Sequence, residues 1–425
     1  MKIKIKKKSY SEVAAIPPMD RIVPKKPSIP FRALIRVASI PDLLFSRFSF
    51  TSEGLEKIKN EPCLILMNHS SFIDLEIAYR IFFPRPLCIV STHDGLVGKK
   101  WLMRQIGCIP TKKIVSDPGL ISDMRYALNE LGASVLMFPE AGYSFDGRTT
   151  TLPKGLGLLA KRLGVPVVSV ITDGAFMRQP LYNELKKRRV KVTAHVKLLL
   201  TDDDYKTKRV AELDDVINAE FSFDAFKSQR DNGVRISERN RADGLHRILY
   251  KCPACKAEGV TVGKGTSLVC GGCGKTYELD EYGVLCSVDG STEFTHVPDW
   301  YDWQRSEVKN ELERGEYRLD AEVDVYVLTD YKALYRVGEG RLVHDSDGFR
   351  LTGCGGELDY SQSPLSSYSL NSDYYWYEIG DVIGIGDSER LYYCFPKGKV
   401  SVAKARLAAE ELYKIRFAEK RRVRI

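Results

Sequence analysis

The chain has 425 residues, of which 44% are hydrophobic, and this length favours two or three packed domains. No apolar run approaches the roughly 18 residues that a membrane-spanning helix requires, and no apolar signal segment follows the basic N-terminus, so we expect neither a transmembrane helix nor a secretory signal. The formal net charge is +8, which suits an anionic partner such as a phospholipid surface or nucleic acid.

Most of this charge lies at the start of the chain. Residues 1–26 hold eight Lys and Arg against two acids, and we predict a basic, flexible segment over residues 1–30. The next stretch, 31–50, places apolar residues on one helical face and both Arg32 and Arg36 on another. This helix could lie on a bilayer with its arginines toward the headgroups, or it could pack on the core of its own domain; the sequence leaves both open.

Short apolar strands alternate with helical segments from residue 60 to residue 200. This pattern is typical of an α/β sheet with helices on both faces, so we predict an α/β domain over 31–227, with a mixed sheet flanked by helices. The clearest helix is predicted over 118–131, with Asp117 as its N-cap. Strands are predicted at 62–67, 86–91, 133–138, 165–171 and 190–200.

The first predicted strand stops abruptly at Asn68-His69, and Asp74 follows five residues after the histidine. Residues five apart on one helix point about 140° apart, so the two side chains can meet only if His69 precedes the helix that Asp74 begins. A neutral imidazole can take a proton from a hydroxyl as it attacks, while a carboxylate fixes the tautomer of the ring. Alone, this spacing is a weak motif, and a polar strand end is the alternative.

Three further motifs follow in order: 107-GCIPTKK-113, 138-FPEAGYSFDGR-148 and 164-GVPVVSV-170. Together with N-H-x4-D they resemble the motifs of the PlsC-like glycerolipid acyltransferase family, which includes lysophosphatidate and glycerol-3-phosphate acyltransferases. The resemblance covers roughly residues 30–225. It implies His69 as general base, Asp74 as the acid that orients it, and acyl-CoA or acyl carrier protein as donor.

The resemblance also implies substrate-binding roles for several polar residues. The basic residue that ends the second motif would bind phosphate, and the acid of the third motif would help to position the acceptor alcohol. These residues are Asn68, Lys113, Glu140 and Ser144.

One departure from the family affects the acceptor. The family's third motif runs F-P-E-G-T-R-S, and its arginine is the expected phosphate clamp because a guanidinium grips phosphate through two hydrogen bonds. Here Tyr143 stands in that position. Arg148, Lys154, Lys112 and Lys113 are the candidates to compensate.

A polar stretch over 228–247 is predicted to be a linker, and a cysteine module over 248–286 follows it. Two C-x-x-C pairs separated by 14 residues indicate a zinc ribbon. Four thiolates leave no open position for water, so the metal is expected to be structural. The module lacks a dense basic and aromatic cluster, which favours a spacer or protein contact over nucleic-acid binding. The predicted ligands are Cys252, Cys255, Cys270 and Cys273.

The last part of the chain, 287–425, alternates aromatic strands and ends in a helix, with a basic tail after it. We predict a mainly β domain that resembles a PH-like domain by its pattern. It could bind lipid headgroups or a protein partner, or it could be purely structural. The whole sequence predicts a cytoplasmic phospholipid-biosynthesis acyltransferase, peripheral on the inner face of the membrane. The alternatives are a non-catalytic scaffold of the same fold and an acyltransferase with a non-phosphate acceptor.

Overall fold

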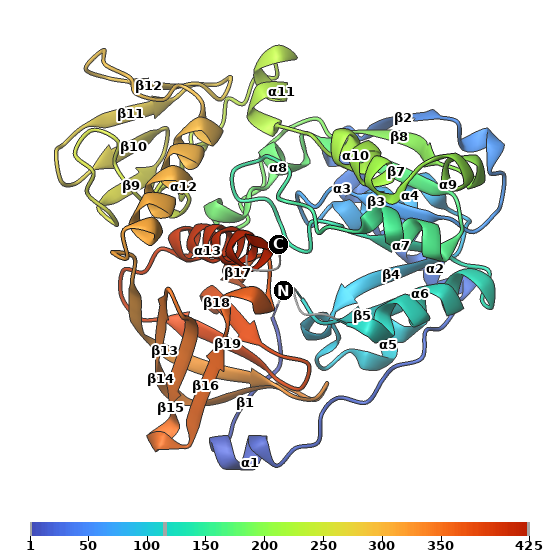
Figure 1. Cartoon of the computed structure of the whole chain (residues 1–425). Helices are drawn as coiled ribbons and strands as arrows, with labels where there is room; N and C mark the ends of the chain where they lie inside the picture. The colour runs from blue at the N-terminus through green and yellow to red at the C-terminus, as the bar shows by residue number, and fades with distance from the viewer. Residues whose placement is uncertain (1, 114–116, 423–425) are drawn as a thin grey trace.

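The computed structural model describes residues 2–113 and 117–422, which form an α/β domain, a small cysteine-containing sheet and a mainly β domain (Figure 1). The α/β domain is built on a mixed sheet, in which β7 and β8 are antiparallel and all other neighbours are parallel. In spatial order the strands are β2 (Ser49–Glu53), β8 (Thr193–Leu200), β7 (Val167–Asp173), β3 (Leu64–Met67), β6 (Ser134–Met137), β4 (Leu87–Thr92) and β5 (Cys108–Thr111).

The predicted mixed sheet flanked by helices is confirmed, and each of the five predicted strands is present. Strand β3 shows why the apolar runs predicted these strands correctly. Ile65 and Met67 pack into the core on one face of the sheet, and Leu64 and Leu66 pack into the core on the other. A strand covered on both faces reads as a continuous apolar run. Strand β2 is exposed along its whole length, so it gave no such signal.

Helices cover both faces of this sheet. The predicted 118–131 helix is present as α6, but Asp117 does not cap it through its side chain; its carboxylate accepts a hydrogen bond from Thr111 Oγ1 at 3.3 Å instead. The helices are α2 (Ile29–Ala38), α3 (Ile40–Phe45), α4 (Asp74–Phe82), α5 (Lys100–Gln105), α6 (Pro118–Asn129), α7 (Leu156–Leu163), α8 (Ala175–Arg178), α9 (Asp202–Thr207), α10 (Val210–Glu220) and α11 (Ala225–Asp231).

The N-terminal segment is not the flexible tail that we predicted over 1–30. Residues Ile5–Lys7 form β1, which pairs in parallel with a strand of the C-terminal β domain, and Tyr10–Ala14 form the short helix α1. The segment then runs along the α/β domain to α2 (Figure 1). The prediction failed because it weighed the lysines and overlooked the apolar residues between them: Val13 and Ile22 are buried.

The cysteine module forms an antiparallel sheet of β9 (Thr261–Lys264), β10 (Ser267–Cys270), β11 (Thr276–Leu279) and β12 (Leu285–Ser287). The predicted linker before it, 228–247, is in fact packed structure. Helix α11 extends into it, and its few apolar residues, Ile236 and Leu245 among them, are buried in the central core. Their wide spacing in a charged stretch concealed this burial.

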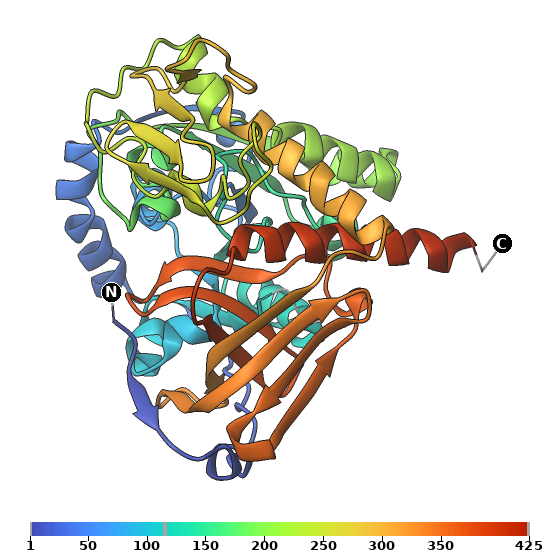
Figure 2. The same cartoon turned by 90° about the vertical axis from the view of Figure 1, so that its left-hand side faces the viewer.

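The C-terminal part is mainly β, as predicted, although the 17-residue helix α12 (Val297–Glu313) precedes its strands. An antiparallel sheet has the order β16 (Leu358–Gln362), β15 (Gly348–Gly353), β14 (Leu334–Asp345), β13 (Leu319–Leu328), β19 (Leu391–Pro396), β18 (Gly380–Gly386) and β17 (Asn371–Trp376). The final helix, α13 (Val402–Arg422), lies between this sheet and the other two parts, and its last turns project outward (Figure 2).

Helix α13 is buried on more sides than its sequence indicated. We predicted one apolar face, containing Val402 and Leu412, and both residues are buried. Leu407 and the charged Arg406 and Glu410 are buried as well, because α12 packs on one side of the helix and the β domain on another. The apolar core around α13 therefore includes residues from all three parts of the molecule.

Candidate functional site

His69 and Asp74 meet at the carboxyl end of β3. His69 lies in the turn after the strand, and Asp74 is the first residue of α4. His69 Nδ1 is 3.0 Å from Asp74 Oδ2, and the same oxygen accepts hydrogen bonds from the backbone N–H groups of Ser70 and Ser71. This turn-then-helix arrangement is the one that the five-residue spacing requires. It leaves His69 Nε2 without a hydrogen-bond partner among the residues that the structure describes.

The His69 ring lies between two aromatic rings. Phe138 stacks at a centroid distance of 4.0 Å and Tyr143 at 3.8 Å, and 19% of the histidine side chain remains exposed. Burial lowers the pKa of His69 below its usual 6.5, and the Asp74 carboxylate offsets this only in part. The imidazole is therefore neutral at pH 7, which is the form that can accept a proton.

Glu140, at the end of the neighbouring strand β6, supports the turn that carries His69. One carboxylate oxygen accepts from the His69 backbone N–H at 2.9 Å and the other from the Thr150 N–H at 2.8 Å. Burial raises the pKa of Glu140 to about 7, although both hydrogen bonds favour the charged form. Both oxygens are thus engaged by backbone N–H groups, so in this structure the carboxylate positions the turn that carries His69.

The residue after Glu140 explains one departure from the family pattern. Ala141 has φ = 54°, in the left-handed region where glycine is favoured because it lacks Cβ. The family's glycine at this position therefore has a backbone reason, and the alanine adopts the same region here. Ser144 stabilises the following turn, since its hydroxyl donates to the Arg148 carbonyl and accepts from the Gly147 N–H. The Ser144 hydroxyl is thus engaged within this turn, and its substrate role stays a prediction.

Asn68 is also used by the fold rather than by a ligand. Its amide oxygen accepts from the N–H and the hydroxyl of Thr172 on β7, and its amide nitrogen donates to the Thr172 carbonyl and to Ser70 Oγ. These bonds tie the end of β3 to the adjacent strand. All polar atoms of the Asn68 side chain are therefore engaged within the protein, and its substrate-binding role stays a prediction.

Arg148 does not replace the missing arginine of the third motif. Its guanidinium makes two hydrogen bonds to Asp302 on α12, at 2.6 and 2.8 Å, and one to Asp146 at 2.9 Å. Two carboxylates already occupy the groups that would grip a phosphate. Lys154 differs, because its ammonium has no carboxylate partner among the described residues and lies 4.8 Å from the ring centroid of Phe417 at the end of α13.

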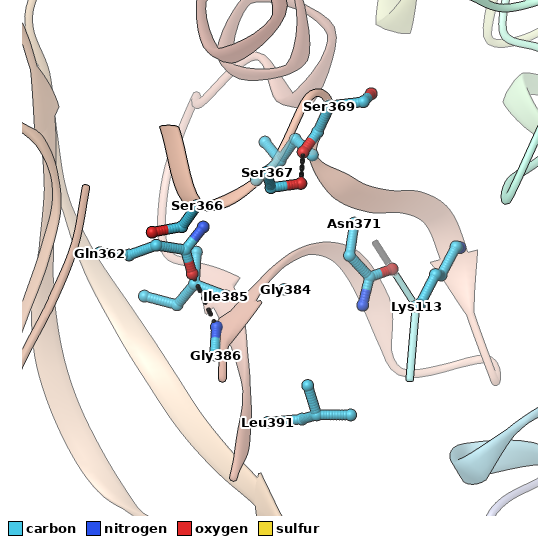
Figure 3. Close-up of a pocket in the computed structure, with 11 residues that line it drawn as sticks. Lys113, Gln362, Ser366, Ser367, Ser369, Asn371, Gly384, Ile385, Gly386 and Leu391 are labelled. Atoms are coloured by element: carbon cyan, nitrogen blue, oxygen red, sulfur yellow. Dashed lines mark hydrogen bonds between the residues drawn. The ribbon is translucent and has the colours of Figure 1, made fainter. Parts of the chain in front are cut away.

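Lys113 lies between the 141–148 loop, where it is close to Gly142, and the β domain. It borders a small polar cavity formed mainly by residues 362–371 and 384–391 of that domain, and Figure 3 shows its side chain directed away from the cavity's centre. The cavity volume is about 20 Å³, room for roughly one water molecule. The lysine's positive charge helps to lower the pKa of His69. Of the predicted phosphate-binding cations, Lys113 is therefore the one associated with the histidine.

Sequence reasoning missed the residue that supports this loop from behind. Arg406 of α13 donates to the Tyr143 carbonyl at 3.2 Å, lies 4.5 Å from the ring centroid of Phe145, and pairs with the buried Glu410. On β17, Tyr374 packs against Phe145 at 4.6 Å. Arg406 is separated from Tyr143 by 263 positions in the chain, and its mid-helix position carried no signal of this contact.

The four predicted metal ligands converge on one point of the small sheet. The Sγ atoms of the two C-x-x-C pairs all lie within 4.8 Å of one another, and the group can hold a metal ion. Cross-pair distances are 3.9 Å between the sulfurs of Cys252 and Cys273 and 3.6 Å between those of Cys255 and Cys270.

Comparison with known proteins defines the class. Residues 49–173 match the family model described as Acyltransferase. A chloroplastic 1-acyl-sn-glycerol-3-phosphate acyltransferase of Brassica napus is 31% identical over 156 residues, which cover 34% of this chain and 43% of that protein. The corresponding LPAT1 of Arabidopsis thaliana is 29% identical over 164 residues, covering 36% and 44%.

Among solved structures, PlsC from Thermotoga maritima, a 1-acyl-sn-glycerophosphate acyltransferase, is similar with 17% identity and a TM-score of 0.35, over 45% of this chain and 78% of that one. The family match assigns residues 49–173, which carry the four motifs, to an acyltransferase domain. More particularly, this part of the chain is similar to glycerolipid acyltransferases, and a cysteine cluster and a mainly β domain follow it. It spans less than half the length of the curated relatives that it matches.

Proposed function

We propose that the protein transfers a fatty acyl group from an acyl thioester, acyl-CoA or acyl carrier protein, to the hydroxyl of a lysophosphatidate-like acceptor. The observation that carries the proposal is the 3.0 Å contact between His69 Nδ1 and Asp74 Oδ2, which leaves Nε2 of a neutral imidazole unpartnered among the described residues. The curated relatives are named for the same reaction type.

Each group has a defined part in the reaction. His69 Nε2 takes the proton of the acceptor hydroxyl while its oxygen attacks the thioester carbonyl, and Asp74 stabilises the resulting imidazolium. The tetrahedral intermediate then collapses to the ester. The thiolate leaves and takes the proton from Nε2. The N–H groups of Ser70 and Ser71 already donate to Asp74, so neither is available to stabilise the oxyanion.

The direct test uses the full chain with a labelled acyl donor and a panel of lysolipid and glycerol acceptors. We expect acyl transfer by the wild type and none by His69→Ala, with unchanged circular dichroism. If no donor is consumed with any acceptor while liposome binding persists, the protein is a non-catalytic scaffold and the proposal fails.

One observation favours a related second candidate, an acyltransferase whose acceptor lacks a phosphate. Tyr143 covers His69 where the family carries an arginine, and the guanidinium of Arg148 is taken by carboxylates. Lys113, whose charge acts on His69, is then the candidate cation for a phosphate beside this histidine. The acceptor panel separates the two candidates, because only the first requires a phosphorylated acceptor. If Lys113 binds the phosphate, charge reversal in Lys113→Glu should raise KM for phosphorylated acceptors and leave KM for the others unchanged.

We further propose that the cysteine cluster holds a structural zinc ion. Tetrahedral Zn–S bonds of about 2.3 Å place sulfurs about 3.8 Å apart, close to the observed 3.9 and 3.6 Å. The four thiolates would fill the coordination shell, so zinc would fix the turns of the ribbon and take no part in acyl transfer. The ribbon and the PH-like domain then serve as a rigid support or a protein-contact surface.

We propose that the acyltransferase works at the surface of an anionic membrane on the cytoplasmic side. No helix within residues 2–113 and 117–422 has the length and apolarity to cross a bilayer. Helix α2 packs one residue on the domain core and leaves other apolar residues exposed, which supports the membrane arrangement that its sequence left open. Ile35 packs against the domain core, whereas Leu34 and Val37 are about 60% exposed. Leu44 and Trp101 add exposed apolar surface nearby, and Phe31 of α2 contacts the Trp101 ring. Binding to anionic but not neutral vesicles would support this placement.

A further inference from the structure

A second, larger pocket lies at the outer end of α13, away from His69. Its cavity volume is about 270 Å³, and it is formed by Leu365, Tyr413, Phe417, Lys420 and Arg421. Tyr413 and Phe417 stack one helical turn apart, with ring centroids 5.7 Å apart and an interplanar angle of 20°. The pocket thus has an apolar, aromatic floor and a cationic rim, and its volume approaches that of small-molecule sites.

The cations around this pocket have no counter-charges within residues 2–113 and 117–422. Lys154 and Arg421 both lie over the Phe417 ring, at 4.8 and 5.0 Å from its centroid, and Lys420 lines the cavity. Among the described residues none of the three has a carboxylate partner. Their neighbours on the same helix do, since Lys414 pairs with Glu411 and Arg416 with Glu419. Three cations left without partners at an aromatic floor fit a ligand with a planar ring and several phosphates.

The pocket is also connected to the catalytic loop through the chain. Thr150 donates to Glu140, which in turn holds the His69 backbone N–H. Lys154 follows four residues later, so its Cα lies within about 14 Å of that of Thr150 at full extension. A pantetheine arm has about thirteen bonds between its sulfur and its phosphorus, roughly 15 Å when extended. The extended arm is thus at least as long as the largest possible Cα separation between Thr150, which donates to Glu140, and Lys154 at the pocket.

We propose that this pocket binds the nucleotide end of acyl-CoA. The adenine would stack on the Tyr413–Phe417 pair, and its phosphates would pair with Lys154, Lys420 and Arg421. The pantetheine arm would run toward His69. This inference rests on the proposed acyltransferase function and makes the donor a coenzyme A thioester rather than a carrier protein, whose phosphopantetheine brings no nucleotide.

Binding is tested without reference to activity. Calorimetric titration of the full chain with adenosine 3′,5′-bisphosphate should show one site. Phe417→Leu, which keeps an apolar side chain but removes the stacking ring, and the double variant Lys420→Ala/Arg421→Ala should each weaken Kd about tenfold or more. Lys414→Ala is the matched control. It removes a cation from the same helix, but Glu411 already neutralises this cation, so the variant should leave Kd unchanged.

Kinetics then link the pocket to the donor. The pocket variants should raise KM for acyl-CoA with kcat preserved, and should leave KM for an S-acyl phosphopantetheine unchanged. Absence of nucleotide binding by a folded wild type, or equal effects on both donors, overturns the proposal. The proposal is also overturned if the pocket variants lose binding to phosphatidylglycerol vesicles but still bind the nucleotide like the wild type. In that case the three cations would form a lipid-headgroup site. If nucleotide binds but no acceptor is acylated, the proposed function fails while the pocket assignment stands.

Discussion

Replacing Asp74 with asparagine separates two contributions of the carboxylate: its hydrogen bonds and its charge. In the structure one oxygen of Asp74 accepts from three donors: the His69 ring and two backbone N–H groups. If the asparagine turned its side-chain NH₂ group toward these donors, that group would oppose two backbone N–H groups with no acceptor between them, which is unfavourable. It should therefore keep its oxygen in place, so the tautomer of His69 is preserved and only the negative charge is lost.

The expected loss follows from Coulomb's law. An imidazolium and a carboxylate about 4 Å apart attract each other by about 4 kcal/mol at an effective dielectric constant near 20, which corresponds to about 10³-fold in kcat. Asp74→Ala should be worse, because it also removes an acceptor from buried N–H groups at a cost of about 1–3 kcal/mol each, and it should lower Tm where Asp74→Asn does not. Initial rates with labelled acyl-CoA and thermal unfolding measure both effects. An Asp74→Asn variant within tenfold of wild-type kcat would refute the role given to the carboxylate.

Three further predictions test the surroundings of the site. Tyr143→Ala uncovers one face of His69, so the pKa depression caused by burial should shrink; because the base must be unprotonated, the acid limb of kcat/KM should move to higher pH. Arg406→Met removes one of the two arginines that pair with the buried Glu410 and leaves Arg305, so denaturant unfolding should show a loss of about 1–3 kcal/mol together with a lower kcat. Cys255→Ser should reduce zinc from one equivalent per chain to substoichiometric and lower Tm by roughly 10 °C or more, with wild-type chelation as the comparison.

The parts of the fold that the sequence predicted are those with local causes. The run around Leu64–Met67 is apolar because both faces of β3 are covered, and the spacing of His69 and Asp74 is set by one turn and the start of one helix. The C-x-x-C pairs are likewise local, since each is a single turn. In all these cases the residues that make the structure lie within a few positions of one another.

The errors concern contacts between distant segments. The lysines of residues 1–30 indicated a solvated tail, but whether Ile5–Lys7 form a strand depends on the free edge of β14, which lies more than 300 residues away. Asn68 looked like a ligand of substrate because it stands beside His69, and only the position of Thr172 on the adjacent strand shows that its amide is fully used. Composition and spacing do not encode which distant partner satisfies a polar group.

Helix α13 gives a structural context for Tyr143, which stands where the family carries an arginine. A guanidinium is still present at this loop, but it comes from Arg406 and lies behind the backbone, where it donates to the Tyr143 carbonyl and stacks on Phe145. In that position it cannot clamp a phosphate; it holds the loop so that the tyrosine ring covers His69. The C-terminal helix is thus part of the wall of the candidate site, and changes in α13 should alter the pKa of His69 as well as the stability of the chain.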